Sequence, residues 1–125
     1  MNKQARKQAR KKAEARGRRA ETLAAWLLRL KGYKILDTRK QTPHGEIDII
    51  ALKGKILAIV EVKQRPTLAL AEEALHTADL SRIEEASYYY QAQRPQLEDK
   101  DIRFDAVYVM PRLRIKHEKD AWRGY

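Results

Sequence analysis

The 125-residue chain contains no cysteine, which narrows its chemistry at the outset. Disulfide bonds, thiolate nucleophiles and cysteine-ligated metal centres are excluded, so carboxylates and histidines are the candidate metal ligands. Long apolar stretches are missing too: no run approaches the roughly 20 residues of a membrane-spanning helix, and the N-terminus lacks the apolar segment of a secretory signal. We therefore expect one ordinary domain that is cytoplasmic and does not associate with a membrane.

Positive charge is concentrated near the N-terminus. Residues 1–19 hold nine lysines and arginines against the single Glu14, which gives this segment a net charge of +8 out of +10 for the whole chain. A basic arm on a nearly balanced body favours binding to a polyanion, and nucleic acid is the leading candidate. The alternative is a solvated tail that only improves solubility.

The periodicity of apolar residues predicts one domain of mixed helices and strands. Ala20, Leu23, Ala24 and Leu27 form a stripe that predicts a helix over 18–31, with a backward extension left open. We expect a short extended segment over 33–39, strands over 46–52, 55–63 and 102–110, a long helix over 70–93, and a strand or irregular tail over 113–122. This order predicts an α/β or α+β sandwich with one central sheet, over residues 18–125, preceded by a basic arm or helix extension over 1–17.

Two adjacent strands carry ionisable residues where an apolar residue would be expected. Glu46 and Asp48 alternate on the first strand, and Glu61 and Lys63 alternate on the second. With Lys53-Gly54 as a two-residue loop, Glu46 pairs with Glu61, whereas a four-residue loop places Asp48 opposite Glu61. Both registers gather the four side chains on one face, while a three-residue loop would separate them.

Three carboxylates this close repel one another unless a cation neutralises them. Mg²⁺ or Mn²⁺ fits, because these ions prefer oxygen ligands and use one or two carboxylates with water and a phosphate. Such a site suits phosphodiester hydrolysis, with Lys63 orienting the water or stabilising developing charge. The alternative is a salt-bridged strand end in solvent, although Ile59, Val60 and Val62 predict that the second strand is buried on both faces.

Asp48 followed by Glu61-Val62-Lys63 resembles the core motif of the PD-(D/E)XK, restriction endonuclease-like nucleases. Together with "RRAETLAAWLLRLKGYKIL", "GEIDIIA", "VEVKQR" and "RFDAVYV", residues 18–122 resemble the YraN-like family of uncharacterised bacterial proteins. This family is similar in fold to archaeal Holliday junction resolvases. The resemblance implies an αβββαβ core whose central mixed sheet is flanked by helices.

The same resemblance implies roles for individual residues. Asp48, Glu61 and Lys63 are expected to be catalytic, and the metal ligands are expected to be Asp48, Glu61, the Val62 carbonyl and Glu21, with Glu46 as an auxiliary carboxylate. An unpartnered Glu21 on the core-facing half of its helix would be costly, and the alternative for it is a capping or surface glutamate. Gln41 and Asp79 stand where the family often carries a basic residue, which concerns substrate contacts.

Several arginines are candidates for phosphate contacts, since half or more of the hydrogen bonds to nucleic acids go to the backbone. They lie near the ends of predicted elements or in the arm: Arg18, Arg19, Arg39, Arg65, Arg82 and Arg103. Each could instead be solvated or structural. The sequence thus predicts a Mg²⁺- or Mn²⁺-dependent nuclease, with DNA favoured over RNA. The alternatives are a non-catalytic nucleic-acid-binding or adaptor protein with the same fold, and a homodimeric interaction protein.

Overall fold

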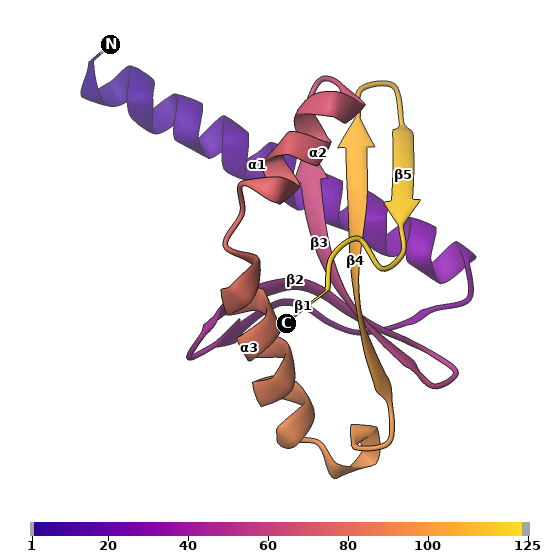
Figure 1. Cartoon of the computed structure of the whole chain (residues 1–125). Helices are drawn as coiled ribbons and strands as arrows, with labels where there is room; N and C mark the ends of the chain where they lie inside the picture. The colour runs from indigo at the N-terminus through magenta and orange to yellow at the C-terminus, as the bar shows by residue number, and fades with distance from the viewer. Residues whose placement is uncertain (1, 124–125) are drawn as a thin grey trace.

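A computed structural model describes residues 2–123 of the chain. Its elements, shown in Figure 1, are α1 (Lys3–Leu30), β1 (Lys34–Thr42), β2 (Gly45–Lys53), β3 (Ile56–Gln64), α2 (Leu68–His76), α3 (Leu80–Ala92), the 3₁₀ turn η1 (Pro95–Leu97), β4 (Asp101–Met110) and β5 (Arg114–Glu118). The segment after β4, predicted as a strand or an irregular tail, therefore begins with a short strand. Within the described residues, no helix is long and apolar enough to cross a membrane.

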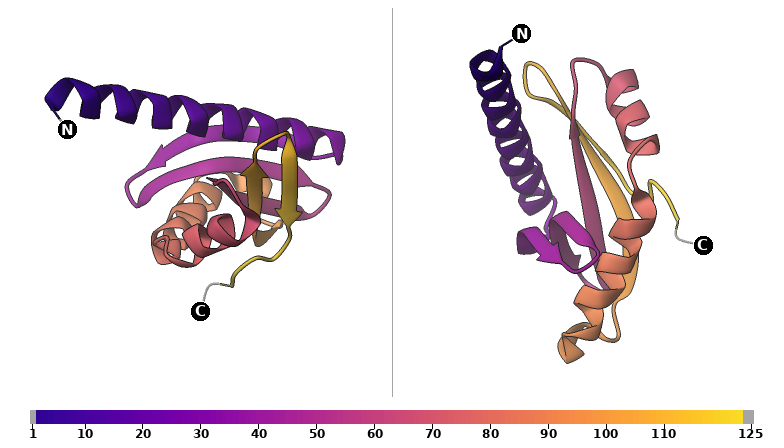
Figure 2. Two further views of the ribbon diagram at one scale, coloured as in Figure 1. Left: turned by 90° about the horizontal axis from the view of Figure 1, so that it is seen from above. Right: turned by 90° about the vertical axis from the view of Figure 1, so that its left-hand side faces the viewer.

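The five strands form one mixed sheet in the order β1-β2-β3-β4-β5. β1, β2 and β3 are an antiparallel meander, β4 runs parallel to β3 after a crossover through α2 and α3, and β5 returns antiparallel to β4. Helix α1 covers one face of the sheet, and α2 and α3 cover the other (Figure 2). The predicted α+β fold with a central mixed sheet flanked by helices is confirmed.

β3 is the central strand because its side chains are apolar on both faces. Ala58 and Val60 pack beneath α1 with Ala24 and Leu28, whereas Leu57 and Ile59 pack beneath α3. These four β3 residues are at most 1% exposed. A strand buried in this way has no solvent face on which to place a carboxylate, so the ionisable residues are confined to its C-terminal end.

The predicted long helix over 70–93 is wrong, because two helices meet at Thr77 to Asp79. Thr77 is the C-cap of α2, and its hydroxyl donates to the carbonyls of Glu73 and Ala74 at the end of that helix. α2 packs on Ala106 and Tyr108 of β4, whereas α3 packs over the β2–β3 region of the sheet. Since the sheet twists between these regions, one straight helix could not cover both.

The β2–β3 turn also differs from the prediction. It consists of Gly54 and Lys55, one residue later than Lys53-Gly54, and Gly54 adopts a φ of +59° that glycine tolerates without strain. Leu52 consequently pairs with Leu57, which is the register that places Asp48 level with Glu61. Of the two registers left open by the sequence, the structure adopts this one.

Helix α1 is a single helix of 28 residues, so the basic arm is a helical extension. The Asn2 side chain accepts a hydrogen bond from the Ala5 amide at 2.7 Å and caps the first turn. The buried residues of α1, namely Ala20, Ala24, Ala25 and Leu28, all lie in its second half. Its first half extends past the edge of the sheet (Figures 1 and 2).

Candidate functional site

The site forms where β2 separates from β3. β2 pairs with β1 along its length, but its pairing with β3 runs only from Ile49 to Lys53. Immediately beyond this point, the Asp48 carboxylate accepts a hydrogen bond from the Val62 amide at 2.8 Å. A side chain thus takes the place of a backbone acceptor, and the carboxylate is held against the C-terminal end of β3.

Glu61 adjoins Asp48 on the neighbouring strand. Burial, a hydrogen bond with Asp48 and repulsion from the Asp48 charge raise the pKa of Glu61 to about 9. The positive charge of Lys63 opposes this shift, and Glu21 adds to it. In the absence of a cation, this shift favours a proton shared between Glu61 and Asp48.

Two further carboxylates reach Asp48 from other elements. Glu21 comes from α1 and Glu46 from β2, and one carboxylate oxygen of each lies within 4.8 Å of the other and of an Asp48 oxygen. Burial and the charges of Asp48 and Glu46 raise the pKa of Glu21, while Arg39 opposes the rise through an ion pair of 2.8 Å. Gln41 donates to the Glu46 carboxylate at 2.6 Å, which holds that more exposed side chain in place.

We call Glu21, Glu46, Asp48 and Glu61 the acidic cluster. Its members offer only oxygen donors, which are the ligands that hard cations prefer. The raised pKa values of Glu21 and Glu61 show that their negative charges are not fully compensated by the surrounding protein. The donor set therefore fits a metal ion, and Glu21, Glu46 and Asp48 are the group whose geometry could hold one.

A groove of about 590 Å³ opens beside the cluster, between α1 and the end of β3. Its α1 wall includes Arg16, Gly17 and Glu21, and its other wall is formed by residues 62–66. Nothing lies within 4 Å of the position that a side-chain carbon on Gly17 would take, so this glycine leaves the wall open. We call this space the α1 groove. It exposes Glu21 and Lys63 to a ligand from opposite sides.

The structure brings the predicted site residues together in part. Asp48, Glu61, Val62, Lys63 and Glu21 meet around the end of β3. Glu46, expected as an auxiliary carboxylate, lies within the geometric group of possible ligands, whereas Glu61 lies beside that group and is hydrogen-bonded to Asp48.

Three of the predicted arginines, Arg65, Arg39 and Arg18, line the hollows on either side of Glu21. Arg65 is exposed and lines the α1 groove. Arg39 binds Glu21 and, with Arg18, lines a cavity of about 250 Å³ on the opposite side of Glu21. Arg19 is exposed on the same helix but lines a different hollow, with Leu23 and Leu113. Arg16, which was not predicted, also lines the groove, and its place one turn before Ala20 on a core-facing stripe is the signal that could have identified it.

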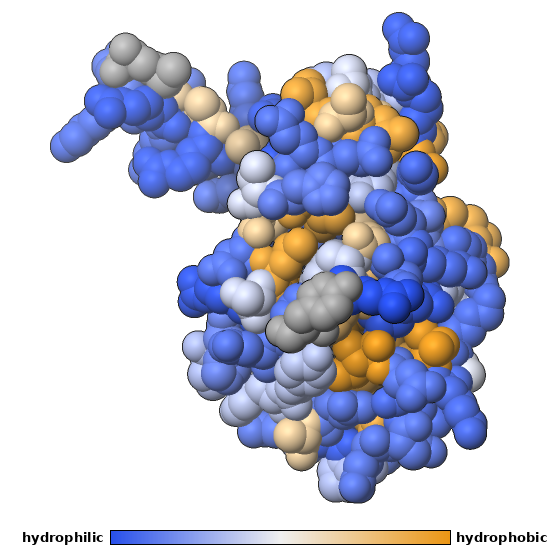
Figure 3. Space-filling model, viewed as in Figure 1, coloured by the Kyte–Doolittle hydropathy of each residue, from blue (hydrophilic) through white to orange (hydrophobic). Residues whose placement is uncertain are grey.

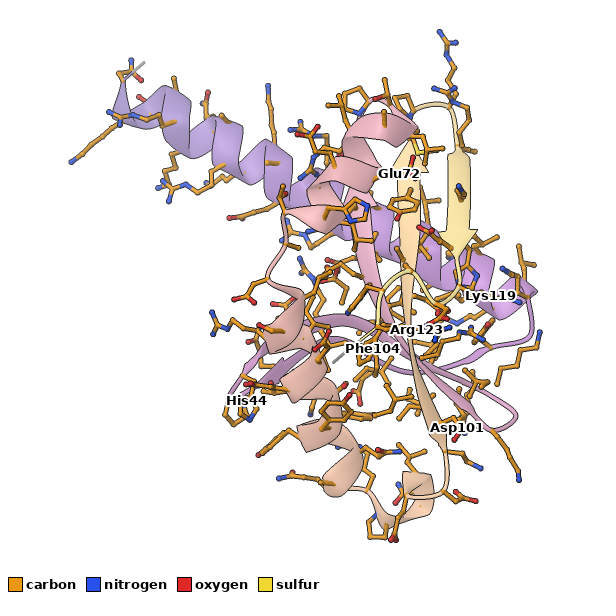
Figure 4. The ribbon with its side chains drawn as sticks, viewed as in Figure 1. His44, Glu72, Asp101, Phe104, Lys119 and Arg123 are labelled. Carbon is orange, nitrogen blue, oxygen red and sulfur yellow. The ribbon has the colours of Figure 1, made fainter. Side chains whose placement is uncertain are left out.

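The other two predicted arginines have intramolecular partners. Arg82 on α3 donates to the carbonyl of His44, which lies at the β1–β2 turn close to α3 (Figure 4). Arg103 makes two hydrogen bonds of 2.7 Å to Asp105 and one of 2.6 Å to the Tyr33 hydroxyl. Its guanidinium is thereby committed inside the protein, and we do not count it among the ligand-binding residues.

Asp105 is the centre of a buried polar network that was not predicted. It is fully buried and accepts hydrogen bonds from Arg103, from His117 Nε2 at 2.8 Å and from the Asp120 amide at 3.0 Å. These bonds hold the pKa of Asp105 below its usual value despite burial. His117 Nδ1 is in turn bonded to Lys31. The network ties α1 to β4 and β5, and Arg103 and Asp105 at alternate positions of one strand are its only sequence signal.

Comparison with known proteins places this arrangement in a family. The family described as "Uncharacterised protein family UPF0102" matches residues 20–109. A UPF0102 protein of Parvibaculum lavamentivorans is 47% identical over 107 residues, covering 86% of this chain and 80% of the relative. A UPF0102 protein of Caulobacter vibrioides is 44% identical over 108 residues, covering 86% of both. A third, from Chelativorans sp., is 46% identical over 113 residues, covering 90% and 91%. The YraN-like resemblance is confirmed, and the chain belongs to the uncharacterised protein family UPF0102.

Proposed function

We propose that the protein is a metal-dependent nuclease that uses Mg²⁺ or Mn²⁺ to hydrolyse phosphodiester bonds in nucleic acid, with DNA favoured. The observation that carries the proposal is the acidic cluster beside Lys63 at the mouth of the α1 groove. The order Asp48, Glu61, Lys63 along β2 and β3 also agrees with the likeness to PD-(D/E)XK nucleases. The basic charge of α1 supplies the attraction for the polyanionic substrate.

In this proposal, Asp48, Glu21 and Glu46 hold the ion with help from Glu61 and the Val62 carbonyl. The chemistry that such an ion supplies when bound is charge neutralisation at the phosphate and activation of water. Val62 orients Asp48 through its amide, and Arg39 orients Glu21, so the carboxylates are preorganised. The proton on Glu61 would pass to the solvent when a bound cation takes its place.

Lys63 and the groove determine where the substrate lies. Lys63 lines the groove, and its charge opposes the rise in the pKa of Glu61. Its ammonium group is therefore close enough to act on the same phosphate as the carboxylates. We assign it the orientation of the attacking water or the stabilisation of charge on the phosphate. Arg16 and Arg65, on the two walls of the groove, would contact neighbouring phosphates.

Titration of Mn²⁺ by calorimetry tests the metal site directly. Wild-type protein should bind the ion, and Asp48→Ala should not. Asp99→Ala is the matched control, because Asp99 is an exposed aspartate whose ion pair is with Lys100, at 3.7 Å. Absence of Mn²⁺ binding by wild-type protein would refute the metal centre.

Cleavage assays on duplex, single-stranded and branched substrates test the activity. Asp48→Ala and Lys63→Ala should abolish metal-dependent cutting without unfolding the protein, whereas Asp99→Ala should cut like wild type. Cutting by Asp48→Ala at the wild-type rate would contradict the assignment.

The basic half of α1 favours a second function, which the same assays separate. A non-catalytic nucleic-acid-binding or adaptor protein that keeps the fold would bind strongly and with steep salt dependence, because binding would rest on phosphate contacts. It would show no metal-dependent cutting on any of the three substrate classes. That combination would replace the nuclease proposal.

A further inference from the structure

The N-terminal part of α1 presents an ordered row of positive charge outside the body of the protein. We call residues 3–12 the overhang; it appears in Figure 3 as a hydrophilic projection. Lys3, Arg6, Lys7 and Arg10 recur at spacings of three and four, so they share one side of the helix, and all are exposed. We call these four residues the basic stripe.

The basic stripe is collinear with the α1 groove. Continuing its spacing along the helix leads to Ala13, Gly17, Ala20 and Glu21, which line the groove, and then to the buried Ala24 and Leu28. The side of α1 that packs on the sheet in its second half is therefore the side that carries the stripe in its first half. A ligand in the groove would meet the stripe as it leaves the body.

The overhang has no internal compensation for its charge. Lys3 and Lys7, Arg6 and Arg10, and Lys7 and Lys11 are like-charge pairs one helical turn apart, and such pairs destabilise a helix. No buried residue of α1 lies in this segment, so packing does not offset the repulsion. A polyanion laid along the basic stripe would offset this repulsion.

The type of polyanion follows from what the overhang lacks. Residues 3–25 contain no aromatic side chain, and proteins that grip single strands use aromatic rings on which bases stack. The overhang therefore lacks the aromatic platform of a single-strand site. A duplex is a stiff partner for a straight helix over this length, because its axis stays nearly straight over about 150 base pairs.

We propose that the overhang binds the phosphate backbone of a duplex that passes from the acidic cluster out through the α1 groove. This inference rests on the proposed function of that cluster and specifies its substrate. Arg10 and Lys3 precede Glu21 by about 16 and 27 Å at 1.5 Å per residue. At 3.4 Å per base pair, the substrate extends about 5 to 8 base pairs from the reacting phosphate on the overhang side.

The test measures binding in EDTA, so that it does not depend on cutting. Fluorescence anisotropy would compare wild type with a stripe variant, in which Lys3, Arg6, Lys7 and Arg10 are all changed to Gln, a residue that also favours helix. The matched control changes four exposed lysines of the body to Gln, at positions 34, 55, 116 and 119, for the same loss of charge. Circular dichroism would verify that both variants retain their helices.

On a 20-base-pair DNA hairpin stem, the stripe variant should bind at least tenfold more weakly than wild type at 0.1 M salt. The slope of log K against log salt should fall by about 3 to 4, because four phosphate contacts are lost. The control variant should lose less than threefold. An equal loss in the control would overturn the proposal, because it would mean that only net charge matters.

Two further comparisons test the duplex and its path. On a 6-base-pair stem, which cannot reach from the groove along the whole stripe, the ratio of wild-type to stripe-variant affinity should shrink; an unchanged ratio would mean that the overhang binds separately from the groove. A 20-nucleotide single strand should bind wild type more weakly than the duplex does, and equal binding would refute duplex preference. An RNA stem of the same length distinguishes a DNA duplex from an RNA duplex as the ligand, and it should bind more weakly than the DNA stem.

The outcomes separate this inference from the proposed nuclease. Stripe-dependent duplex binding without metal-dependent cutting would leave the binding surface standing and refute the enzyme. Metal-dependent cutting with stripe-independent binding would support the enzyme and refute the binding surface.

Discussion

Without a bound cation, the acidic cluster should destabilise the fold, and Asp48→Asn should relieve that cost. The substitution removes one negative charge but keeps an oxygen that can accept the Val62 amide hydrogen bond of 2.8 Å. Asp48→Ala is the comparison, since it removes both the charge and the acceptor. Leaving the Val62 N–H without its partner costs about 1–3 kcal/mol.

The expected gain follows from the separations in the cluster. At 4.8 Å, the largest distance among the grouped oxygens of Glu21, Glu46 and Asp48, two like charges repel by about 3.5 kcal/mol at an effective dielectric constant near 20, and by about 0.9 kcal/mol in bulk water. Glu46 is exposed and Arg39 offsets part of the charge on Glu21. We therefore expect Asp48→Asn to be more stable than wild type by about 1–2 kcal/mol at pH 8 in EDTA.

The dependence of stability on pH tests the same repulsion a second time. Because the pKa values of Glu21 and Glu61 are raised in the folded protein, the folded state binds more protons than the unfolded state between their usual pKa and the raised one. Wild-type stability without metal should consequently fall as pH rises from about 4.5 toward 9. The advantage of Asp48→Asn should be small at pH 5 and grow toward pH 9.

Urea unfolding followed by circular dichroism measures these differences. In EDTA at pH 8 the order of stability should be Asp48→Asn, wild type, Asp48→Ala. Saturating Mn²⁺ should reverse the first two, because an ion at 100 times its dissociation constant adds about 2.7 kcal/mol to wild type alone. Asp99→Asn, an exposed control, should stay within about 0.5 kcal/mol of wild type. An Asp48→Asn variant that is less stable than wild type in EDTA at pH 8 and at pH 9 would refute the reasoning.

The remaining predictions concern the framework of the site. Asp105→Ala should lower the free energy of unfolding by about 3–5 kcal/mol, because it leaves the Arg103 guanidinium without its carboxylate. Since the pKa of Asp105 is lowered in the folded protein, the stabilisation that it provides should be present above about pH 4 and lost as the pH falls further. Urea titrations in which Asp105→Ala loses less than about 1 kcal/mol would contradict this prediction. Gly17→Ala should stabilise the helix at the groove by up to about 1 kcal/mol, seen as slower amide hydrogen exchange in α1, because an added methyl group meets nothing within 4 Å. Gly32→Ala, at a φ of +94°, should instead destabilise the protein by about 1 kcal/mol or more, and equal effects of the two substitutions would rule out this backbone argument.

Much of the fold could be predicted because local patterns and tertiary packing agree. The uninterrupted apolar run through Ile59 and Val60 predicted a strand buried on both faces, and β3 is the central strand. The stripe from Ala20 to Leu27 predicted the anchored part of α1. The break between α2 and α3 could not be predicted in the same way, because the apolar periodicity continues across Thr77 to Asp79 and the twist of the sheet decides where each helix can pack.

The candidate site shows the same division. Strand alternation was enough to place Asp48 near Glu61, but the choice between two registers depended on whether Gly54 occupied the first or the second position of the turn. That Glu46 would join Glu21 and Asp48 depended on β2 pairing with β3 only from Ile49 onward, a feature with no local signal. The commitment of Arg103 to Asp105 required β4, β5 and the start of β1 to come together.

By itself, the sequence determined the concentration of positive charge near the N-terminus and the acidic hairpin, because charge and period-two alternation are local properties. It left open whether the basic arm continues the helix, and the structure shows that it does. Only the tertiary structure decided that α1 crosses the sheet so that Glu21 reaches a carboxylate 27 positions further along the chain. The same packing directs the basic stripe along the side of α1 that faces the groove. Ala20, Ala24 and Leu28 fix the rotation of the helix against β3, and a rigid helix transmits that rotation to its exposed N-terminal residues.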